Sequence, residues 1–231
     1  MKNVLLECKN LSARYGAFRA LKEVSVEFKD GEAVALFGHN GSGKSTLLRC
    51  CVGAHYDAAG EVVFAGQAVV PGAVHRNVRL GIGFVPQGKN VFKELPVEKN
   101  LHIAGMVSGD RDVGKIYELF PVLRERKRQI AGTMSGGEQQ MVAFGMALMT
   151  NPRLLLLDEP TTGLSPAAAD VLLQTISRVQ KAMSVGIIIV EHNIPRTLKF
   201  VDRVVVMKMG RVIADKPSNQ LSGTQQLWQW F

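Results

Sequence analysis

The feature that most constrains the fold is a glycine-rich segment, GHNGSGKS at 38–45, which directly follows the apolar run AVALF at 33–37. A continuous apolar run of this length is typical of a buried parallel strand. Glycines in such a segment let backbone N–H groups close around phosphate oxygens, while Lys44 can reach β- and γ-phosphates and Ser45 can hold Mg²⁺. The run STLLRCCVGA that follows has the apolar spacing of a short helix. The sequence therefore predicts a strand, a phosphate-binding loop and a helix in succession.

Strand-like and helix-like runs alternate along the rest of the chain. Residues 4–36 have the pattern of strands and turns, EVVFAGQAVV at 61–70 is predicted as an edge strand, and GIGFVPQ at 81–87 as a buried one. Helical periodicity dominates from 90 to 150, in GKIYELFPVLRERKRQI and GEQQMVAFGMALM. After 152, the strand-like runs RLLLLDEP, VGIIIVEHN and RVVVMKMGRVIA alternate with the helical runs PAAADVLLQTISRVQKAM and IPRTLKFVD.

This alternation predicts an α/β fold with a mostly parallel sheet. We expect a single domain over 1–231, in which a nucleotide-binding core, 1–89 and 151–231, is interrupted by a helical subdomain at 90–150. A chain of 231 residues is long enough for one large core with such an insertion.

Polar side chains follow three of the predicted strands. In LLLLDE, Asp158 ends a buried strand, where it can meet Mg²⁺ beside Ser45, and Glu159 can polarise an attacking water. Gln87 follows GIGFVP and can reach the metal or the water through its amide oxygen, and His192 follows the strand VGIIIV. Ligands of α/β sheets bind at the carboxyl ends of the parallel strands, where these side chains would gather. Taken singly, each has an ordinary alternative as a surface acid, a turn residue or a strand-end histidine.

A second glycine turn lies near the middle of the chain, in GTMSGGEQQMVAFGMALM at 132–149. Ser-Gly-Gly opens a predicted helix there, and a helix N-terminus offers free N–H groups to an anion. The chain therefore carries two predicted phosphate cradles, of which only the first includes a lysine.

The order of these elements resembles that of the ATP-binding cassette ATPases, and the resemblance covers essentially the whole chain. The residues that match, in the family's order, are Gly38, His39, Asn40, Gly41, Ser42, Gly43, Lys44, Ser45, Thr46, then Gln87, then Ser135, Gly136, Gly137, Glu138, then Asp158, Glu159, and finally His192. The resemblance implies a P-loop NTPase (RecA-like) core with a mostly parallel sheet, N-terminal antiparallel strands and an inserted α-helical subdomain.

The same resemblance implies that the chain binds and hydrolyses ATP with Mg²⁺. The residues it places at the metal are Ser45, Gln87 and Asp158, and those it places in catalysis are Lys44, Gln87, Glu159 and His192. Tyr15 matches the aromatic residue that stacks on adenine; a strand-end core aromatic is the alternative for this residue.

In this family two cassettes pack head to tail, and each Ser-Gly-Gly turn binds the γ-phosphate held by the other chain's P-loop. By the resemblance, Ser135, Gly136, Gly137 and Glu138 serve the ATP of a partner chain. The second cradle then needs no lysine of its own, because the partner supplies one.

Longer stretches narrow the resemblance. YELFPVLRER, GTMSGGEQQMVAFGMALM, NPRLLLLDEPTTGLSP and ADKPSNQL resemble the smaller ATPase subunit, the Liv F-type, of branched-chain amino-acid importers and its urea and amide relatives. Ser165, where many cassettes have Asp, and Met134, where many have Leu, follow the same group.

This narrower resemblance implies partners and a place in the cell. They are a second ATPase subunit, itself or a sister chain, two transmembrane permease subunits and, indirectly, a solute-binding protein. The segment 88–105 after Gln87 would pass motion to a permease. The chain would lie peripherally on the cytoplasmic face of the inner or plasma membrane, and the transported solute would be chosen by the other subunits.

Two other functions stay open at this point: the ATPase of an exporter, such as one for lipopolysaccharide, and a soluble cassette protein that acts on ribosomes or DNA. The formal charge of +8 would suit nucleic acid, but such proteins usually fuse two cassettes or carry long insertions, and this chain has neither. The excess charge is scattered apart from RERKRQ at 124–129, which is predicted as a solvated basic helix face. We therefore expect no nucleic-acid partner.

Three cysteines, Cys8, Cys50 and Cys51, give an odd count without a metal-binding spacing, which favours a reduced, cytosolic compartment. Glu7 interrupts the apolar residues at 4–6, so no signal-peptide core is expected, and no window approaches the roughly 20 apolar residues of a membrane span. The terminal LWQWF departs from the Liv F-type ending, and core packing by Trp228 and Phe231 is the expectation for it.

Overall fold

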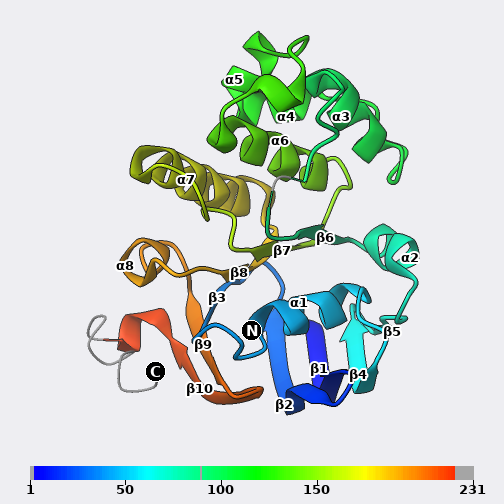
Figure 1. Ribbon diagram of the computed structural model, residues 1–231, viewed down its shortest axis with the longest axis vertical. Helices are drawn as coiled ribbons and strands as arrows, with labels where there is room; N and C mark the ends of the chain where they lie inside the picture. Colours follow the sequence, from blue (N-terminus) through cyan, green and yellow to red (C-terminus); the bar gives the residue numbers. More distant parts are fainter. Residues whose placement is uncertain (1–2, 89, 222–231) are drawn as a thin grey trace.

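The computed structural model describes residues 3–88 and 90–221, which form two sheets flanked by helices (Figure 1). A six-stranded sheet has the order β10-β9-β3-β8-β7-β6, and a four-stranded sheet has the order β2-β1-β4-β5. The strands of the two sheets are β1 (Val4–Tyr15), β2 (Phe18–Lys29), β3 (Ala33–Phe37), β4 (Ala58–Phe64), β5 (Gln67–Ala68), β6 (Ile82–Val85), β7 (Leu154–Asp158), β8 (Gly186–Val190), β9 (Arg203–Lys208) and β10 (Arg211–Pro217). The helices are α1 (Lys44–Val52), α2 (Val74–Arg79), α3 (Val97–Gly105), α4 (Gly114–Leu119), α5 (Pro121–Glu125), α6 (Gly136–Leu148), α7 (Pro166–Met183) and α8 (Ile194–Thr197), with short 3-10 turns at Ala131–Thr133 and Ser218–Gln220.

The six-stranded sheet is parallel from β9 to β6, and only β10 runs antiparallel to its neighbour. Alternate side chains of β3 enter two different cores: Ala35 and Phe37 pack with residues of α6 and α7, and Val34 and Leu36 pack with residues of α1 and the antiparallel sheet. Because both faces are covered, every residue of β3, β7 and β8 is buried, which explains their unbroken apolar runs. The predicted α/β class with a mostly parallel sheet and N-terminal antiparallel strands is confirmed.

Helices α3 to α6 all lie between β6 and β7 in the chain, and Figure 1 shows them together beyond the β6–β7 end of the sheet. The helical pattern predicted at 114–130 is divided into α4 and α5 at Pro121, because proline lacks an N–H and fits the first turn of a new helix. Helix α5 ends at Glu125, so most of the basic run 124–129 lies in an exposed turn. The run is solvated, as predicted, but the prediction that it forms a helix face is wrong. The division into a core and a subdomain at 90–150 stays a prediction.

The stretch predicted as one edge strand at 61–70 is also different in the structure. It contains the end of β4 and the two-residue β5, joined by a turn at Ala65 and Gly66. Both turn residues have positive φ, 48° and 77°, as a tight two-residue hairpin requires. β4 lies inside the sheet between β1 and β5, so the edge assignment holds only for β5.

No helix within the described ranges is long and apolar enough to cross a membrane. All three cysteines are buried free thiols, and the sulfur atoms of Cys8 and Cys51 lie 3.7 Å apart. The expectation for LWQWF falls outside the residues that the structure describes.

Candidate active site

The loop between β3 and α1 needs its glycines for steric reasons. Gly38 has φ 148°, and a Cβ atom there would lie 2.2 Å from the carbonyl oxygen of Met207. Gly43 has φ 102°, and its Cβ would lie 2.7 Å from the carbonyl oxygen of Ala20. A side chain at either position would force the loop apart, so the glycines allow the backbone to curl over the start of α1. The hydroxyl of Ser42 is buried within this curl and has no hydrogen-bond partner in the described part of the chain.

Lys44 folds back across this loop. Its Nζ donates hydrogen bonds to the carbonyl oxygens of Gly38, at 2.6 Å, and His39, at 3.0 Å. Burial lowers the pKa of Lys44, while the nearby carboxylates of Glu159 and Asp158 oppose that shift. The lysine thus stands within the loop as a partly desolvated cation, which strengthens its attraction for an anion that displaces the carbonyl contacts.

Ser45 and Asp158 meet where the loop faces the tip of β7. The Ser45 hydroxyl donates to Asp158 Oδ1 at 2.9 Å. Asp158 is only 1% exposed, and burial raises its pKa, an effect that the Ser45 hydrogen bond partly opposes. A hydroxyl and a buried carboxylate side by side form the hard oxygen donor set that Mg²⁺ prefers.

Glu159, the next residue, has both carboxylate oxygens occupied. Oε1 lies 2.8 Å from His192 Nε2, and Oε2 accepts hydrogen bonds from Gln87 Nε2 at 2.6 Å and from Thr162 Oγ1 at 3.1 Å. The structure thus joins three of the predicted residues, which lie far apart in the sequence. Gln87 turns its amide nitrogen to the acid, so a contact of its amide oxygen with a metal stays a prediction.

A pocket of ≈ 300 Å³ opens beside the loop. Its lining includes Tyr15, Asn40, Gly41, Gly43, Lys44, Ser45, Thr46, Gln87 and Glu159 from the predicted set, together with Phe18 and Ala20. Tyr15 is 45% exposed, so the alternative of a core aromatic is wrong. Its ring centroid lies 4.7 Å from that of His55, and the two rings are tilted by 59°. An exposed aromatic ring in the lining of this pocket is a side chain on which a nucleotide base can stack.

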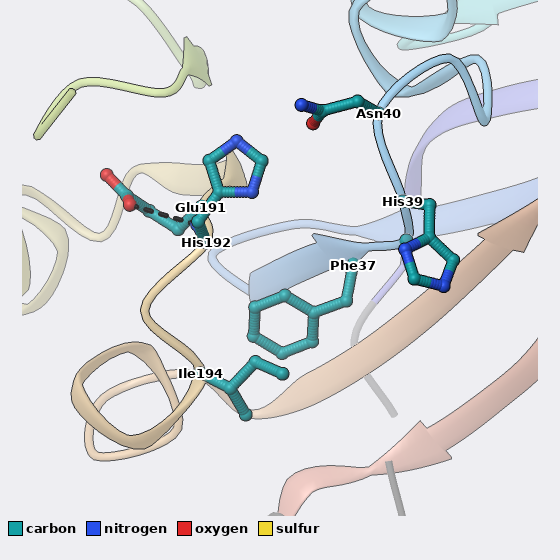
Figure 2. Close-up of a pocket in the computed structure, with 7 residues that line it drawn as sticks. Phe37, His39, Asn40, Glu191, His192 and Ile194 are labelled. Atoms are coloured by element: carbon teal, nitrogen blue, oxygen red, sulfur yellow. Dashed lines mark hydrogen bonds between the residues drawn. The ribbon is translucent and has the colours of Figure 1, made fainter. Parts of the chain in front are cut away.

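A second pocket, of ≈ 420 Å³, lies on the other side of Asn40. Figure 2 shows His39 and Asn40 on one wall, His192 and Glu191 on the opposite loop, and Phe37 and Ile194 at the apolar end. His192 is exposed, whereas Glu191 is buried. The two predicted elements, loop and strand-end histidine, therefore face each other across open space.

Ser135 to Glu138 occupy a different part of the molecule. Ser135 caps α6: its hydroxyl accepts from the N–H of Glu138, and Glu138 accepts in return from the N–H of Ser135 at 2.9 Å. Gly136 and Gly137 form the first turn, and none of these residues is among those that line the two pockets. α6 packs on the face of the sheet opposite to α1, so one chain does not bring the two predicted cradles together.

Sequence reasoning missed three contributors to this region. Thr162 donates to Glu159, Glu191 lies buried beside His192, and Phe18 lines the pocket with Tyr15. Phe18 could have been predicted because it follows Tyr15 across a tight turn, and Glu191 because it directly follows a buried strand. Thr162 has an ordinary loop position in the sequence, and only the fold reveals its contact.

A strand, a glycine loop with a lysine, and a second strand tipped by a carboxylate define a P-loop nucleoside triphosphatase. The family model described as ABC transporter matches residues 21–162, which is more than half of the chain. The chain therefore belongs to the ABC transporter family, and it is an ATP-binding cassette ATPase.

Individual relatives agree with this assignment. The chain is 43% identical over 213 residues to the high-affinity branched-chain amino acid transport ATP-binding protein BraG of Pseudomonas aeruginosa, covering 90% of this chain and 91% of that protein. It is 35% identical over 221 residues to the probable branched-chain amino acid transport ATP-binding protein LivF of Archaeoglobus fulgidus, covering 94% of each. A nucleotide-free ATP-binding cassette from an ABC transporter superposes with a TM-score of 0.86 and 27% identity, covering 99% of this chain and 95% of the other.

Proposed function

We propose that this chain is the ATP-hydrolysing subunit of an importer for branched-chain amino acids or a related small polar solute. The observation that carries the proposal is the arrangement around Glu159, whose carboxylate is held by Gln87 and His192 beside the lysine loop. The solute class is supported by the likeness to BraG and LivF, whose names state branched-chain amino acid transport.

In the proposed reaction each side chain has a task that its position allows. Lys44 exchanges its loop carbonyls for β- and γ-phosphate oxygens and offsets the charge that grows on the transferred group. Glu159 orients and polarises the attacking water, and Gln87 and His192 fix its carboxylate. Tyr15 stacks on the adenine.

Ser45 and Asp158 are proposed to hold Mg²⁺, with Gln87 close by. Their hydroxyl and carboxylate oxygens lie 2.9 Å apart in a buried corner beside the lysine, so the residues present fit this ion. When held there, the ion would supply positive charge that offsets the negative charge of the phosphate groups.

The proposed working unit is a head-to-tail pair of cassettes, formed with a second copy or with a sister ATPase. Ser135 is exposed and begins α6 on the face of the sheet away from the lysine loop. Its turn is therefore available to the ATP of a partner, as the family resemblance implies. Two permease subunits in the membrane, a solute-binding protein that acts through them, and a peripheral place on the cytoplasmic face complete the proposal.

Transport is the direct test of the solute class. Cells that lack this chain should lose uptake of labelled leucine, and the parent chain should restore it. Lys44→Ala should not restore it, because the loss of such electrostatic stabilisation slows hydrolysis on the order of 10²-fold. Labelled urea measured in the same cells distinguishes the related solutes, and leucine uptake that never depends on this chain would contradict the proposal.

A tethered dimer tests the head-to-tail arrangement. Ser135→Arg blocks the site of the partner copy, and Lys44→Ala damages the site of its own copy. With both changes in one copy, both sites are damaged; with the changes in opposite copies, one site stays whole. We expect more ATP bound per tethered dimer in the second arrangement, measured by equilibrium dialysis. More binding in the first arrangement would show that the turn acts in its own chain.

A further inference from the structure

Glu191 is a buried acid that none of the roles above uses. It follows β8 and precedes His192, and it is 3% exposed. Its Oε1 accepts a hydrogen bond from the N–H of Thr161 at 3.0 Å, and its Oε2 accepts from the Thr161 hydroxyl at 2.8 Å and from the N–H of His192 at 3.2 Å. One carboxylate therefore joins the loop after β7 to the loop after β8.

Both of these loops hold Glu159. Thr162, next to Thr161, donates its hydroxyl to one carboxylate oxygen of Glu159, and His192 contacts the other at 2.8 Å. Figure 2 shows the side chains of Glu191 and His192 leaving their loop in different directions. The contact that binds the loops together is thus separate from the contact that holds Glu159.

The backbone of Glu159 is strained, so contacts of its loop must hold that conformation in place. Its φ is 50°, a left-handed conformation that is strained for a residue with a Cβ. Such strain persists only where surrounding contacts fix the conformation. The N–H of Glu159 bonds to the carbonyl of Val190 at 2.9 Å, and the double hydrogen bond of Glu191 to Thr161 fixes the loop two residues further on.

The charge of Glu191 also requires an explanation. Burial raises its pKa, while the hydrogen bonds from Thr161 and His192 oppose that shift. A carboxylate has enough lone pairs for three donors, whereas a glutamine amide has one acceptor oxygen and would turn its NH₂ group towards one of the donors. An acid is therefore the side chain that suits this junction.

We propose that Glu191 is a positioning residue that holds the Thr161 loop and the His192 loop in the geometry that ATP hydrolysis needs. It acts on Glu159 through these loops and touches neither nucleotide nor water. The inference rests on the proposed roles of Glu159 and His192.

The test compares Glu191→Gln with Glu32→Gln. Glu32 is also buried, at 9% exposure, and accepts a hydrogen bond from a backbone N–H, but it lies before β3 at the other end of the sheet. We expect Glu191→Gln to lower kcat about tenfold or more, because a hydrogen bond to a charged group contributes about that factor. Binding of a fluorescent ATP analogue should stay within about twofold of the parent, since the lysine loop and Tyr15 are unchanged. Glu32→Gln should leave kcat of the folded protein unchanged.

A milder variant covers the case in which Glu191→Gln does not fold. Thr161→Val removes only the hydroxyl donor and keeps the N–H, so it should lower kcat about threefold to tenfold, in keeping with one lost hydrogen bond, with unchanged analogue binding. A folded Glu191→Gln with parental kcat, or a soluble Thr161→Val with parental kcat where Glu191→Gln is insoluble, would overturn the inference.

Glu159→Gln, measured alongside, separates the two proposals. If Glu159→Gln hydrolyses ATP at the parental rate, the proposed role of Glu159 fails, and the role of Glu191 fails with it. If Glu159→Gln is inactive and Glu191→Gln is fully active, only the inference about Glu191 fails.

Discussion

The two ends of the parallel strands carry charged side chains in very different ways. At the amino ends, opposite charges are paired: Arg203 contacts Glu32 at 3.2 Å and Asp215 at 3.0 Å, and Arg153 contacts Asp30 at 2.7 Å. Arg203 also lies over a phenylalanine ring and donates to a backbone carbonyl. The Arg203–Glu32 pair is largely buried, so removing either partner would leave an unpaired charge inside the fold, whereas the Arg153–Asp30 pair is exposed.

At the carboxyl ends, like charges gather. Asp158, Glu159 and Glu191 follow or end two neighbouring strands, and burial raises the pKa of Asp158 and of Glu191. Burial lowers the pKa of Lys44 in the same region. An arrangement that opposes the charged forms of acids and base alike does not favour folding, and such departures are expected at functional sites. Paired charges therefore suit stability at the amino ends, and the unfavourable burial of charge at the carboxyl ends suits the proposed reaction.

The largest effect is expected for Glu159→Gln at the carboxyl end. Hydrolysis should fall on the order of 10²- to 10⁴-fold, because a positioned base is lost, while ATP still binds. With ATP and Mg²⁺ the variant should elute as a dimer in size exclusion, alone or with its sister subunit. Asp30→Asn removes a carboxylate from the amino end and should hydrolyse ATP within about twofold of the parent, since it lies far from the reacting groups. Equal losses of activity in the two variants would show that the carboxylates at the two ends do not differ in function.

Lys44→Ala should lower the rate of hydrolysis on the order of 10²-fold or more, because the cation that offsets the developing charge is removed. Phosphate release at saturating ATP measures this effect. Arg153→Ala removes a cation from the amino end and should have the parental rate. Activity of Lys44→Ala within twofold of the parent would refute its assignment.

Arg203→Ala tests the amino end by its own measure. The free energy of unfolding should fall by about 3 kcal/mol, because the buried carboxylate of Glu32 loses its partner. Arg211→Ala breaks an exposed pair with Glu23, 3.7 Å apart, and should change stability by less than about 1 kcal/mol. Urea unfolding measures both, and the ATPase rate per folded molecule should not change. A selective loss of activity in Arg203→Ala would show that the amino end takes part in hydrolysis, which contradicts the prediction.

The smallest effect on the site is expected for Tyr15→Ala, which removes an uncharged neighbour of the carboxyl end. ATP should bind about tenfold more weakly, because stacking of a base on an aromatic ring contributes about 1–3 kcal/mol. kcat at saturating ATP should stay unchanged. Tyr15→Phe keeps the ring and should bind like the parent, and weak binding by that variant would indicate that the hydroxyl, which contacts Arg49 at 3.4 Å, matters more than the ring.

The sequence predicts the polar residues at the carboxyl ends of the strands, but it does not predict the ion pairs at the amino ends. The lysine loop, the acids after LLLL and the histidine after IIIV stand out because a buried parallel strand is an unbroken apolar run, and ligands lie where such runs end. Arg203, Glu32 and Asp215 look like ordinary charged residues, since their pairing depends on strand order. No local pattern states which strands become neighbours.

The failures have local physical reasons. The helix predicted through Pro121 divides there because proline removes an N–H, and the edge strand at 61–70 becomes a hairpin because Ala65 and Gly66 take positive φ. Glu191 directly follows the apolar run IIIV, so its position carried the same signal as the acids after LLLL. Its hydrogen bonds to Thr161, which distinguish its role, appear only when β7 and β8 lie side by side.

One measurement tests the contrast between the two ends most directly. Asp158→Asn and Glu32→Gln each neutralise one buried carboxylate and keep its size and an acceptor oxygen. Asp158 has no ion-pair partner within the described ranges, whereas Glu32 is paired with Arg203. Urea unfolding of both variants, without nucleotide or metal, compares them with the parent at neutral pH.

We predict shifts of opposite sign in the free energy of unfolding. Asp158→Asn should be more stable than the parent, because a raised pKa means that the ionised acid destabilises the folded state at a pH above its ordinary range. Glu32→Gln should be less stable by about 2 kcal/mol, because its charged hydrogen bonds to Arg203 are weakened. If both variants lose stability to the same extent, the charges at the two ends serve the same purpose, and the account is wrong.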